Sequence, residues 1–287
     1  MTVLEAIQKS AEFLGKKNVE SPRLQVELLL AHLLKLPRMK LYLNFERVLS
    51  ASETDALREL VKRRGQREPL QHIVGSTSFC GYEIAVNRHA LVPRPETELL
   101  AELGWEFLVT RHPPLVTALD FGTGTGCIAI ALAAKCPNAK IVATDISEEA
   151  LSLAKENAAR NNVAGRIEFL QSDGFAGLST GSRFDLIVSN PPYIPSAEIE
   201  TLQAEVRDFD PRSALDGGAD GLDFYRTLAI EARPFLNADG KILLEFGDGQ
   251  AEAIRRIFED EKWIVEAVKD DYSRRARILI ANMGCGR

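Results

Sequence analysis

An α/β fold is predicted, with a doubly wound, mostly parallel sheet of seven strands behind a small N-terminal helical domain. From residue 116 onward, short apolar runs alternate with amphipathic helical segments, which is typical of a parallel sheet covered by helices on both faces. Residues 1–72 show helical periodicity only. The 287 residues are sufficient for one sheet domain and a smaller helical unit.

The composition is that of a soluble globular protein, with 45% hydrophobic and 26% charged residues. The formal net charge of −6 is uneven. Residues 1–90 carry 14 Lys and Arg against 10 Asp and Glu, whereas residues 91–287 carry 21 against 31. This acidic bulk argues against sequence-independent nucleic-acid binding, which depends on many contacts from Lys and Arg to phosphate. It does not exclude a local basic patch.

Neither a membrane segment nor a metal site is expected. No apolar run approaches the roughly 20 residues of a membrane span, and the N-terminus lacks the apolar core of a signal peptide. The scattered cysteines form no CxxC pair, so we expect no disulfide framework, no zinc site and a cytoplasmic location. These cysteines are Cys80, Cys127, Cys136 and Cys285.

Three capping signals divide the N-terminal region into helices. Thr2-x-x-Glu5 and Ser50-x-x-Glu53 are capping boxes, and Ser21 places an N-cap before a proline at the first helical position. The apolar stripes behind them indicate core packing. A basic run ends the third helix and is either a solvated helix face or a docking patch for an acidic or RNA-bearing partner. It comprises Arg58, Lys62, Arg63, Arg64 and Arg67.

Residues 73–95 are predicted to form a β-hairpin linker, because glycines and alternating apolar residues fill this stretch. Pro93 and Pro95 then make a stiff turn before a helix that runs to about residue 111. The seven strands are expected at 116–121, 140–145, 167–171, 184–189, 241–246, 264–269 and 277–281. The last two are joined by a short turn and should pair antiparallel.

A glycine-rich loop follows the first strand and opens a helix. It comprises Gly122, Thr123, Gly124, Thr125 and Gly126. In such sheets ligands bind at the carboxyl ends of the strands, and glycines there let the backbone approach a ligand closely. The GxGxG spacing differs from the dinucleotide fingerprint, so a nucleoside ligand without pyrophosphate fits better. The alternative is a tight βα turn without a ligand.

Acidic residues stand at the ends of the next two strands. Asp145 can accept hydrogen bonds from both ribose hydroxyls, although it could also serve only the helix start beside Ser147. Asp173 could accept from the exocyclic amino group of adenine. Gly174 offers a backbone amide beside it, and Phe175 offers an apolar wall.

The sequence Asn190-Pro191-Pro192-Tyr193 ends the fourth strand. Proline fixes φ, lacks an N–H and holds the preceding residue extended, so the loop presents acceptors: the Asn190 side-chain oxygen and the Pro191 carbonyl. Two acceptors at fixed spacing suit a planar –NH2 group, and Tyr193 can pack against a flat substrate. A plain proline turn is the alternative.

These motifs together resemble S-adenosylmethionine-dependent methyltransferases that act on an amide or amino nitrogen. The wider match resembles the release-factor glutamine N5-methyltransferase family, PrmC, once called HemK, over essentially the whole chain. It is carried by QHIVG (71–75), FCGYEIAV (79–86), VPRPETE (92–98), PRSALDGGADGL (211–222) and LLEFG (243–247). Relatives that methylate a ribosomal protein typically carry Pro-Arg-Ser-Pro where this chain has Pro93-Arg94-Pro95-Glu96, which favours the release-factor reading.

The resemblance implies a class I methyltransferase-like fold, S-adenosyl-L-methionine as cofactor, and class I peptide chain release factors as protein substrates. The reaction it implies is methylation of the glutamine in their Gly-Gly-Gln loop. It implies roles for three segments: a substrate-docking domain at 1–72, the linker at 73–95 and a methyltransferase domain at 96–287. Family members often carry a bulky residue where Gly174 stands, so adenine packing is expected to fall to Phe175.

The implied site has two groups of residues. The cofactor would be held by residues 122–126, Asp145, Asp173, Gly174, Phe175 and Asn190. Catalysis and substrate binding would fall to Asn190, Pro191, Pro192 and Tyr193. The acceptors would hold the amide nitrogen in line with the methyl group and stabilise the positive charge that grows on it, without a strong general base. All four histidines, His32, His72, His89 and His112, lie outside the glycine-rich loop, the acidic strand ends and the NPPY motif.

Two further readings remain. An N6-adenine DNA methyltransferase can use a similar NPPY loop, but it needs a basic target-recognition region, and residues 91–287 are acidic. A cofactor-binding module without catalysis is the other. An intact NPPY loop argues against it, and cofactor binding without turnover on any substrate would favour it.

Overall fold

The computed structural model describes residues 1–111 and 115–284, and these form two compact units. Unit 1 consists of Met1–Ser76 and Gln203–Phe209, and unit 2 of the remaining described residues. His112 and Cys285 lie outside the described residues. Among the helices described, none is long and apolar enough to cross a membrane.

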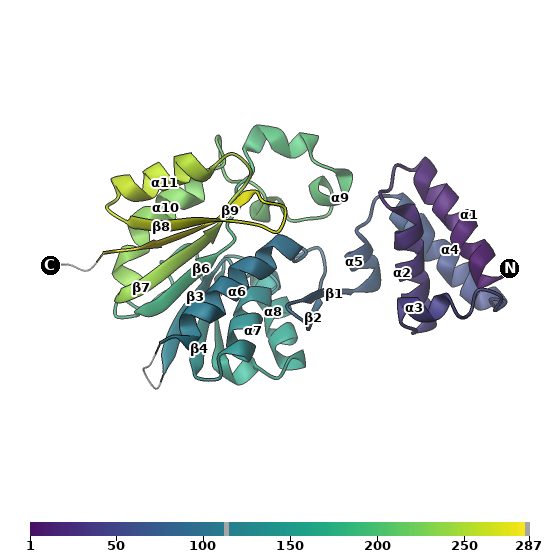
Figure 1. Ribbon diagram of the computed structural model, residues 1–287, viewed down its shortest axis with the longest axis horizontal. Coiled ribbons are helices and arrows are strands. Elements are labelled where there is room, and N and C mark those ends of the chain that lie inside the picture. Colours follow the sequence, from purple (N-terminus) through teal and green to yellow (C-terminus); the bar gives the residue numbers. More distant parts are fainter. Residues whose placement is uncertain (112–114, 285–287) are drawn as a thin grey trace. The chain divides into compact units, whose positions relative to one another are not determined.

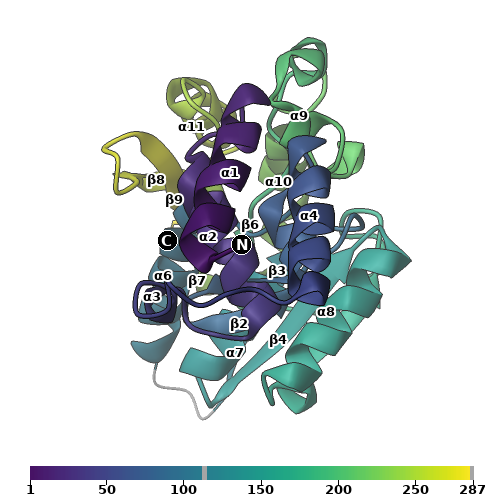
Figure 2. The ribbon, with the colours of Figure 1, turned by 90° about the vertical axis from the view of Figure 1, so that its right-hand side faces the viewer.

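Unit 1 is helical, as predicted (Figures 1 and 2). Both capping boxes are confirmed: Thr2 and Glu5 exchange hydrogen bonds at the start of α1, and Ser50 and Glu53 do so at the start of α4. The Ser21 side chain makes no cap bond, because its backbone is left-handed with φ 47°. The helices are α1 (Val3–Lys16), α2 (Pro22–Leu34), α3 (Arg38–Leu41), α4 (Ala51–Gly65), α5 (Leu70–Val74) and α9 (Ala204–Arg207).

Helix α9 reaches unit 1 from far along the chain, and its Glu205 is held by the basic run. Arg64 Nη2 lies 2.7 Å from Glu205 Oε1, and Arg67 pairs with the other carboxylate oxygen. Arg63 pairs with Glu68 at 2.6 Å. Arg63, Arg64 and Arg67 are therefore paired with carboxylates of unit 1, and the docking patch for an acidic or RNA-bearing partner stays a prediction.

We expect Glu205→Ala to release segment 203–209, because the substitution leaves the nearly buried Arg64 without its carboxylate. Breaking such a pair costs about 3–5 kcal/mol. Hydrogen exchange in this segment should rise at least tenfold, read by mass spectrometry. Asp208→Ala, which removes a half-exposed pair with Arg207, is the control and should leave exchange unchanged. Equal exchange in both variants would contradict this role of Glu205.

Unit 2 contains a seven-stranded sheet in the order β5-β4-β3-β6-β7-β9-β8, which confirms the predicted fold class. Only β9 runs antiparallel, and it lies between β7 and β8. The strands are β3 (Val116–Phe121), β4 (Ala139–Asp145), β5 (Ile167–Gln171), β6 (Phe184–Ser189), β7 (Leu236–Glu245), β8 (Ile264–Asp270) and β9 (Ala276–Asn282). The strand order reverses between β3 and β6, which is where ligands bind in sheets of this kind.

Helices cover both faces of the sheet (Figure 1). On one face lie α6 (Pro95–Val109), α7 (Cys127–Lys135) and α8 (Glu148–Arg160), and on the other α10 (Asp223–Glu231) and α11 (Ala251–Asp260). Each face has its own apolar core. Short 3-10 helices occupy the loops: η1 (Ala164–Arg166), η2 (Ser196–Thr201), η3 (Arg212–Ala214) and η4 (Arg233–Phe235).

The predicted hairpin is present as β1 (Ser76–Phe79) and β2 (Tyr82–Ala85), but nearly all of it belongs to unit 2. Phe79 and Ile84 are buried in the core of unit 2. The buried Asn157 exchanges two hydrogen bonds with the backbone of Ala85, at 2.8 and 3.0 Å, and also donates to the Thr125 carbonyl at 2.9 Å. The hairpin thus braces the glycine-rich loop rather than acting as a free linker.

Candidate active site

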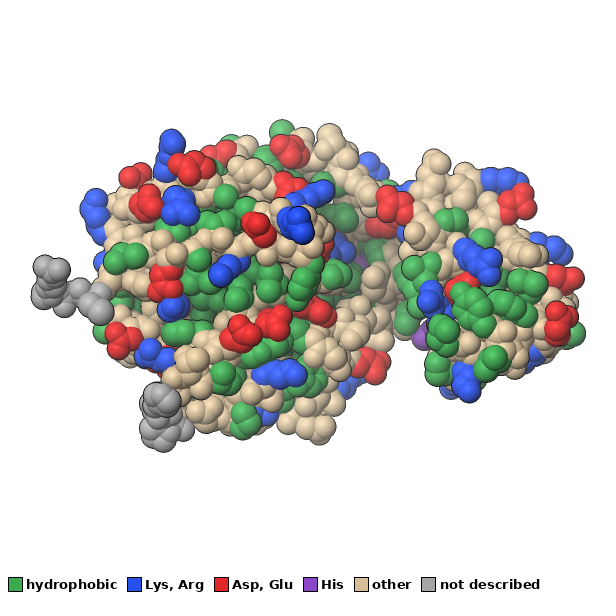
Figure 3. Space-filling view, viewed as in Figure 1, with side chains coloured by type: hydrophobic (Ala, Val, Ile, Leu, Met, Phe, Trp, Pro, Cys, Tyr) green, Lys and Arg blue, Asp and Glu red, His purple; other side chains and the backbone are tan. Residues whose placement is uncertain are grey.

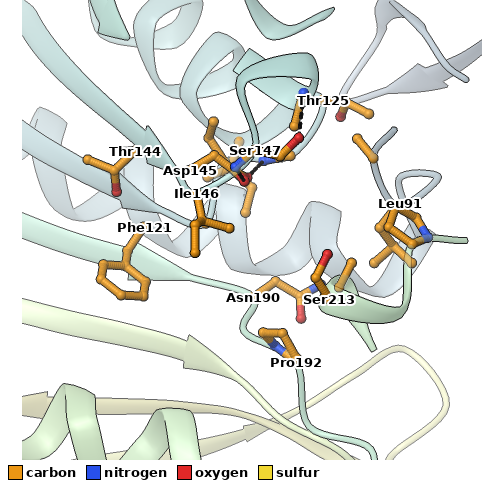
Figure 4. Close-up of a pocket in the computed structure, with 18 of the residues that line it drawn as sticks. Leu91, Phe121, Thr125, Thr144, Asp145, Ile146, Ser147, Asn190, Pro192 and Ser213 are labelled. Atoms are coloured by element: carbon orange, nitrogen blue, oxygen red, sulfur yellow. Dashed lines mark hydrogen bonds between the residues drawn. The ribbon is translucent and has the colours of Figure 1, made fainter. Parts of the chain in front are cut away.

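A cavity of about 330 Å³ opens at the carboxyl ends of β3, β4 and β6 in unit 2. The structure brings most of the predicted site residues together there: Gly122, Thr123, Gly124, Thr125, Asp145, Asp173, Gly174, Asn190 and Pro192. In Figure 4 the turn of Asp145 to Ser147 faces Asn190 and Pro192 across the cavity, between Phe121 and Leu91. This volume suits a small-molecule ligand.

The glycine-rich loop has the backbone shape that its sequence requires. Gly122, Gly124 and Gly126 all have positive φ, between 54° and 80°. A Cβ on Gly126 would lie 2.9 Å from the Cβ of Ala154, so this glycine allows α7 to start close against α8. Gly126 does not line the cavity and acts through packing.

The Asp120 side chain holds the glycine-rich loop through hydrogen bonds, a role that was not predicted from the sequence. Its Oδ2 accepts from the Thr123 hydroxyl at 2.6 Å and from the Ala129 amide at 3.0 Å. Its Oδ1 is buried without a hydrogen-bond partner among the described atoms. Burial, with a smaller contribution from the charge of Asp145, raises the pKa of Asp120 to about 7.

The raised pKa predicts how Asp120→Asn changes stability with pH. Above the ordinary pKa of 3.8 the folded wild type retains a proton that the unfolded chain loses, so its stability falls as pH rises towards 7. Asparagine has no such titration. Between pH 5 and pH 8 the wild type should therefore lose roughly 1–3 kcal/mol relative to the variant. Urea unfolding at the two pH values measures this, and a pH-independent difference would contradict it.

Asp145 is the last residue of β4, and Asp173 follows the neighbouring strand β5, and both line the cavity. Asp145 Oδ2 accepts from the Gly124 amide at 2.8 Å, and Oδ1 accepts from the Ser147 amide at 3.0 Å. The Asp145 carboxylate therefore fixes the glycine-rich loop and still has lone pairs for a ligand. Ile146, which is 58% exposed, adds apolar surface beside it.

Phe175 is not a wall of the cavity in this structure. It is 4% exposed and packs against Phe121 and Phe235, with ring centroids 4.9 and 5.1 Å away. The alternation of side chains along a strand could not predict the burial of Phe175, because the chain turns sharply after Asp173. The apolar lining comes instead from side chains that the sequence did not single out, including Phe121 and Leu91.

The Asn190 loop is held firmly. Asn190 Nδ2 donates to Thr97 Oγ1 at 3.1 Å, which leaves the amide oxygen as its free acceptor. Pro191 is buried, and Tyr193 packs against Gly247 behind the wall instead of lining the cavity. Burial raises the pKa of Tyr193 to about 12, and its carbonyl accepts from Gln250 Nε2 at 2.9 Å.

Two loops complete the cavity, and sequence reasoning had assigned neither to the site. Residues 89–97 contribute His89, Arg94 and Thr97, and residues 211–216 contribute Ser213 and Asp216. Arg94 Nη2 donates to the buried Asp210 at 2.7 Å, which ties the two loops together. Pro93 and Pro95 in the first loop restrict its backbone, and this was the sequence signal that could have predicted a rigid wall there.

Comparison with known proteins identifies the chain as a methyltransferase. A family model described as "PrmC N-terminal domain" matches residues 5–75, and one described as "Methyltransferase small domain" matches residues 102–207. A release factor glutamine methyltransferase of Geobacter sulfurreducens is 44% identical over 257 residues, which cover 90% of this chain and 88% of the relative. The chain belongs to the release factor glutamine methyltransferase family.

A second relative carries the same family name, and two solved structures share the fold. A release factor glutamine methyltransferase of Chlorobaculum tepidum is 40% identical over 94% of this chain and 93% of its own. Among solved structures, a methyltransferase from Pyrococcus furiosus is 25% identical, with a TM-score of 0.52 over 72% of this chain and 91% of its own. The human Mettl16 catalytic domain shares the fold at 14% identity, with a TM-score of 0.55 over 82% of each chain.

The chain is therefore an enzyme of this family, and the cavity at the β3–β6 switch point is its candidate active site. In residues 1–111 and 115–284, no three His, Cys, Asp or Glu side chains gather in an arrangement that could hold a metal ion.

Proposed function

We propose that the protein methylates the side-chain amide nitrogen, N5, of the glutamine in the Gly-Gly-Gln motif of class I peptide chain release factors, with S-adenosyl-L-methionine as methyl donor. Family membership supports this, and the observation that carries it is the orientation of Asn190. Its nitrogen is bound to Thr97, so its oxygen is available to accept from an –NH2 group in the cavity.

The cavity fits the cofactor. Asp145 keeps acceptor capacity for the two ribose hydroxyls, and Ile146 offers an apolar surface next to it. Asp173 and the backbone of Gly174 lie on the same wall for the adenine, with the loop of residues 122–125 beneath. A bound S-adenosylmethionine supplies an electrophilic sulfonium methyl group.

The substrate's amide nitrogen is a poor nucleophile, because its lone pair is delocalised into the carbonyl. Asn190 Oδ1 and the Pro191 carbonyl would accept its two N–H bonds and fix the nitrogen in position for attack. Positive charge grows on the nitrogen as it is methylated, so both hydrogen bonds strengthen in the transition state. The proton can leave afterwards, and a strong base is not needed.

A substrate-docking role for residues 1–72 is part of the proposal. Unit 1 exposes apolar side chains on and beside α3: Met39 is 67% exposed, Leu43 76% and Val48 67%. Apolar groups in such numbers are typical of a protein contact surface. Over the face of unit 2 that Figure 3 shows, basic and acidic side chains are interspersed, which supports a protein substrate over a nucleic acid.

A transfer assay with tritiated S-adenosylmethionine tests the function. Purified class I release factor should become labelled, and a variant with the Gly-Gly-Gln glutamine replaced by alanine should not. A short Gly-Gly-Gln peptide should be labelled with a higher KM, since it lacks the surface for unit 1. Label on neither protein, with cofactor binding intact, would overturn the proposal and direct the assay to ribosomal protein and to adenine in DNA.

A further inference from the structure

The loop that carries Asn190 is held at both of its ends. At its start, the Asn190 side chain donates to Thr97 at 3.1 Å. At its far end, the Ile194 amide donates to the Leu215 carbonyl at 3.0 Å, and the Ile194 carbonyl accepts from the Gly217 amide at 2.9 Å. Between these ends two prolines fix φ but supply no N–H donor. The middle of the loop is held by a contact from a separate element.

Gln250, which directly precedes α11, supplies this contact. Its Nε2 donates to the Tyr193 carbonyl at 2.9 Å and to the Gly221 carbonyl at 3.3 Å, and its Oε1 accepts from the Gly247 amide at 2.9 Å. These partners fix the orientation of the side-chain amide, because a reversed amide would set its oxygen against two carbonyl groups. Gln250 does not line the cavity, so it acts on other residues and not on a ligand.

Residues 217–221 lie close against the same loop. A Cβ on Gly217 would be 2.9 Å from the Tyr193 Cα, and a Cβ on Gly221 would collide with the Tyr193 carbonyl oxygen. Glycine is the residue that permits such a close approach of two backbones. Gln250 joins the two segments, since it donates to one carbonyl group of each.

An ordinary structural role for Gln250 would be to cap α11. Its side chain makes no capping hydrogen bond to that helix, and two of its three partners lie in the Asn190 loop and in residues 217–221. In the mechanism proposed above, the Pro191 carbonyl is one of the two acceptors, and it lies two residues before the carbonyl that Gln250 holds. A small shift of this backbone would misplace an acceptor relative to the substrate nitrogen.

We propose that Gln250 is a positioning residue that fixes the loop of the two substrate acceptors through the Tyr193 carbonyl. This role rests on the proposed function, in which the Asn190 oxygen and the Pro191 carbonyl receive the substrate –NH2 group. Loss of the Gln250 donors should lower turnover without weakening the binding of S-adenosylmethionine, because most of the predicted cofactor partners stand at the ends of β3, β4 and β5.

Two variants of the full chain separate the donors of Gln250 from its acceptor. Gln250→Glu keeps an oxygen for the Gly247 amide but sets a carboxylate oxygen against the Tyr193 carbonyl. Gln250→Met keeps the length of the side chain and loses all three hydrogen bonds. Each should lower kcat for release factor about 10- to 100-fold, the effect of a misplacement of up to about 1 Å, with Kd for S-adenosylmethionine nearly unchanged. Glu252→Gln, which removes an exposed pair with Arg256 at the start of α11, is the control and should leave kcat unchanged.

A double variant distinguishes positioning from a general loss of stability. In the Asn190→Ala background one of the two acceptors is already absent, so Gln250→Met should lower kcat by a much smaller factor than it does in wild type. Equal factors in the two backgrounds would contradict an action through this loop.

Hydrogen exchange provides a measurement that does not require activity. The Ile194 and Ser196 amides donate to the carbonyls of Leu215 and Gly218. Both amides should exchange about tenfold faster in the two Gln250 variants, because the loop opens more often when its middle is released. The control variant should exchange them at the wild-type rate.

The outcomes separate this role from the proposed function. Wild-type turnover in Gln250→Glu would overturn the inference alone. A parallel loss of kcat and cofactor affinity, or failure of both Gln250 variants to fold, would also overturn it, since either would assign Gln250 to the stability of the domain. Absence of methylation by wild type would overturn the proposed function, and the exchange of Ile194 and Ser196 would still decide whether Gln250 holds the loop.

Discussion

Replacing Asn190 by alanine is expected to lower kcat for release factor methylation by roughly 10²–10³-fold, the range seen when one preorganised hydrogen-bonding group is removed from a transition-state site. The variant loses the acceptor that positions the substrate –NH2 group and stabilises the charge growing on it. Asp145 and the glycine-rich loop remain in place, so affinity for S-adenosylmethionine should change far less. Single-turnover labelling and calorimetric titration of the cofactor measure the two effects separately.

Asn138→Ala is the matched control for this experiment. Asn138 is exposed and precedes β4, at the opposite end of that strand from Asp145. Its replacement should leave kcat unchanged. Turnover of Asn190→Ala close to that of wild type would refute the amide-clamp mechanism, even if the release factor proved to be the true substrate.

The Asp145→Ala variant should show the reverse pattern, with affinity for S-adenosylmethionine lost first. The carboxylate holds the Gly124 and Ser147 amides and is placed to accept from ribose hydroxyls. Hydrogen bonds to a charged group contribute about 1.5–3 kcal/mol each. We therefore expect Kd for the cofactor to rise by roughly 10²-fold, while kcat at saturating cofactor falls much less.

Glu149→Ala provides the control for the same helix start. Glu149 is exposed and accepts from the Ser147 hydroxyl, so its loss changes local charge without touching the Asp145 carboxylate. Cofactor affinity should stay near that of wild type in this variant. An unchanged Kd in Asp145→Ala would show that the ribose is not held there, and the cofactor would have to be placed elsewhere in the cavity.

The fold could be predicted from the sequence because its signals are local. The βα alternation after residue 116 and the capping boxes at Thr2 and Ser50 each involve residues close together in the chain. The strand ends at 122–126, 145, 173 and 190 were also correctly placed at one edge, since parallel strands bring their carboxyl ends together. For the same reason, Asp145 and Asn190 could be named from the sequence alone.

What the tertiary structure decided are contacts between residues far apart in the chain. Gln203–Phe209 belongs to unit 1 because Glu205 meets Arg64 and Arg67, more than 130 positions away. Phe175 turns into the core, and Asn190 is held by a hydrogen bond to Thr97, which comes from another element, α6. Local patterns predicted the strand ends that meet at the cavity, whereas packing between distant segments decided that Phe175 lies in the core and that residues 89–97 and 211–216 complete the cavity.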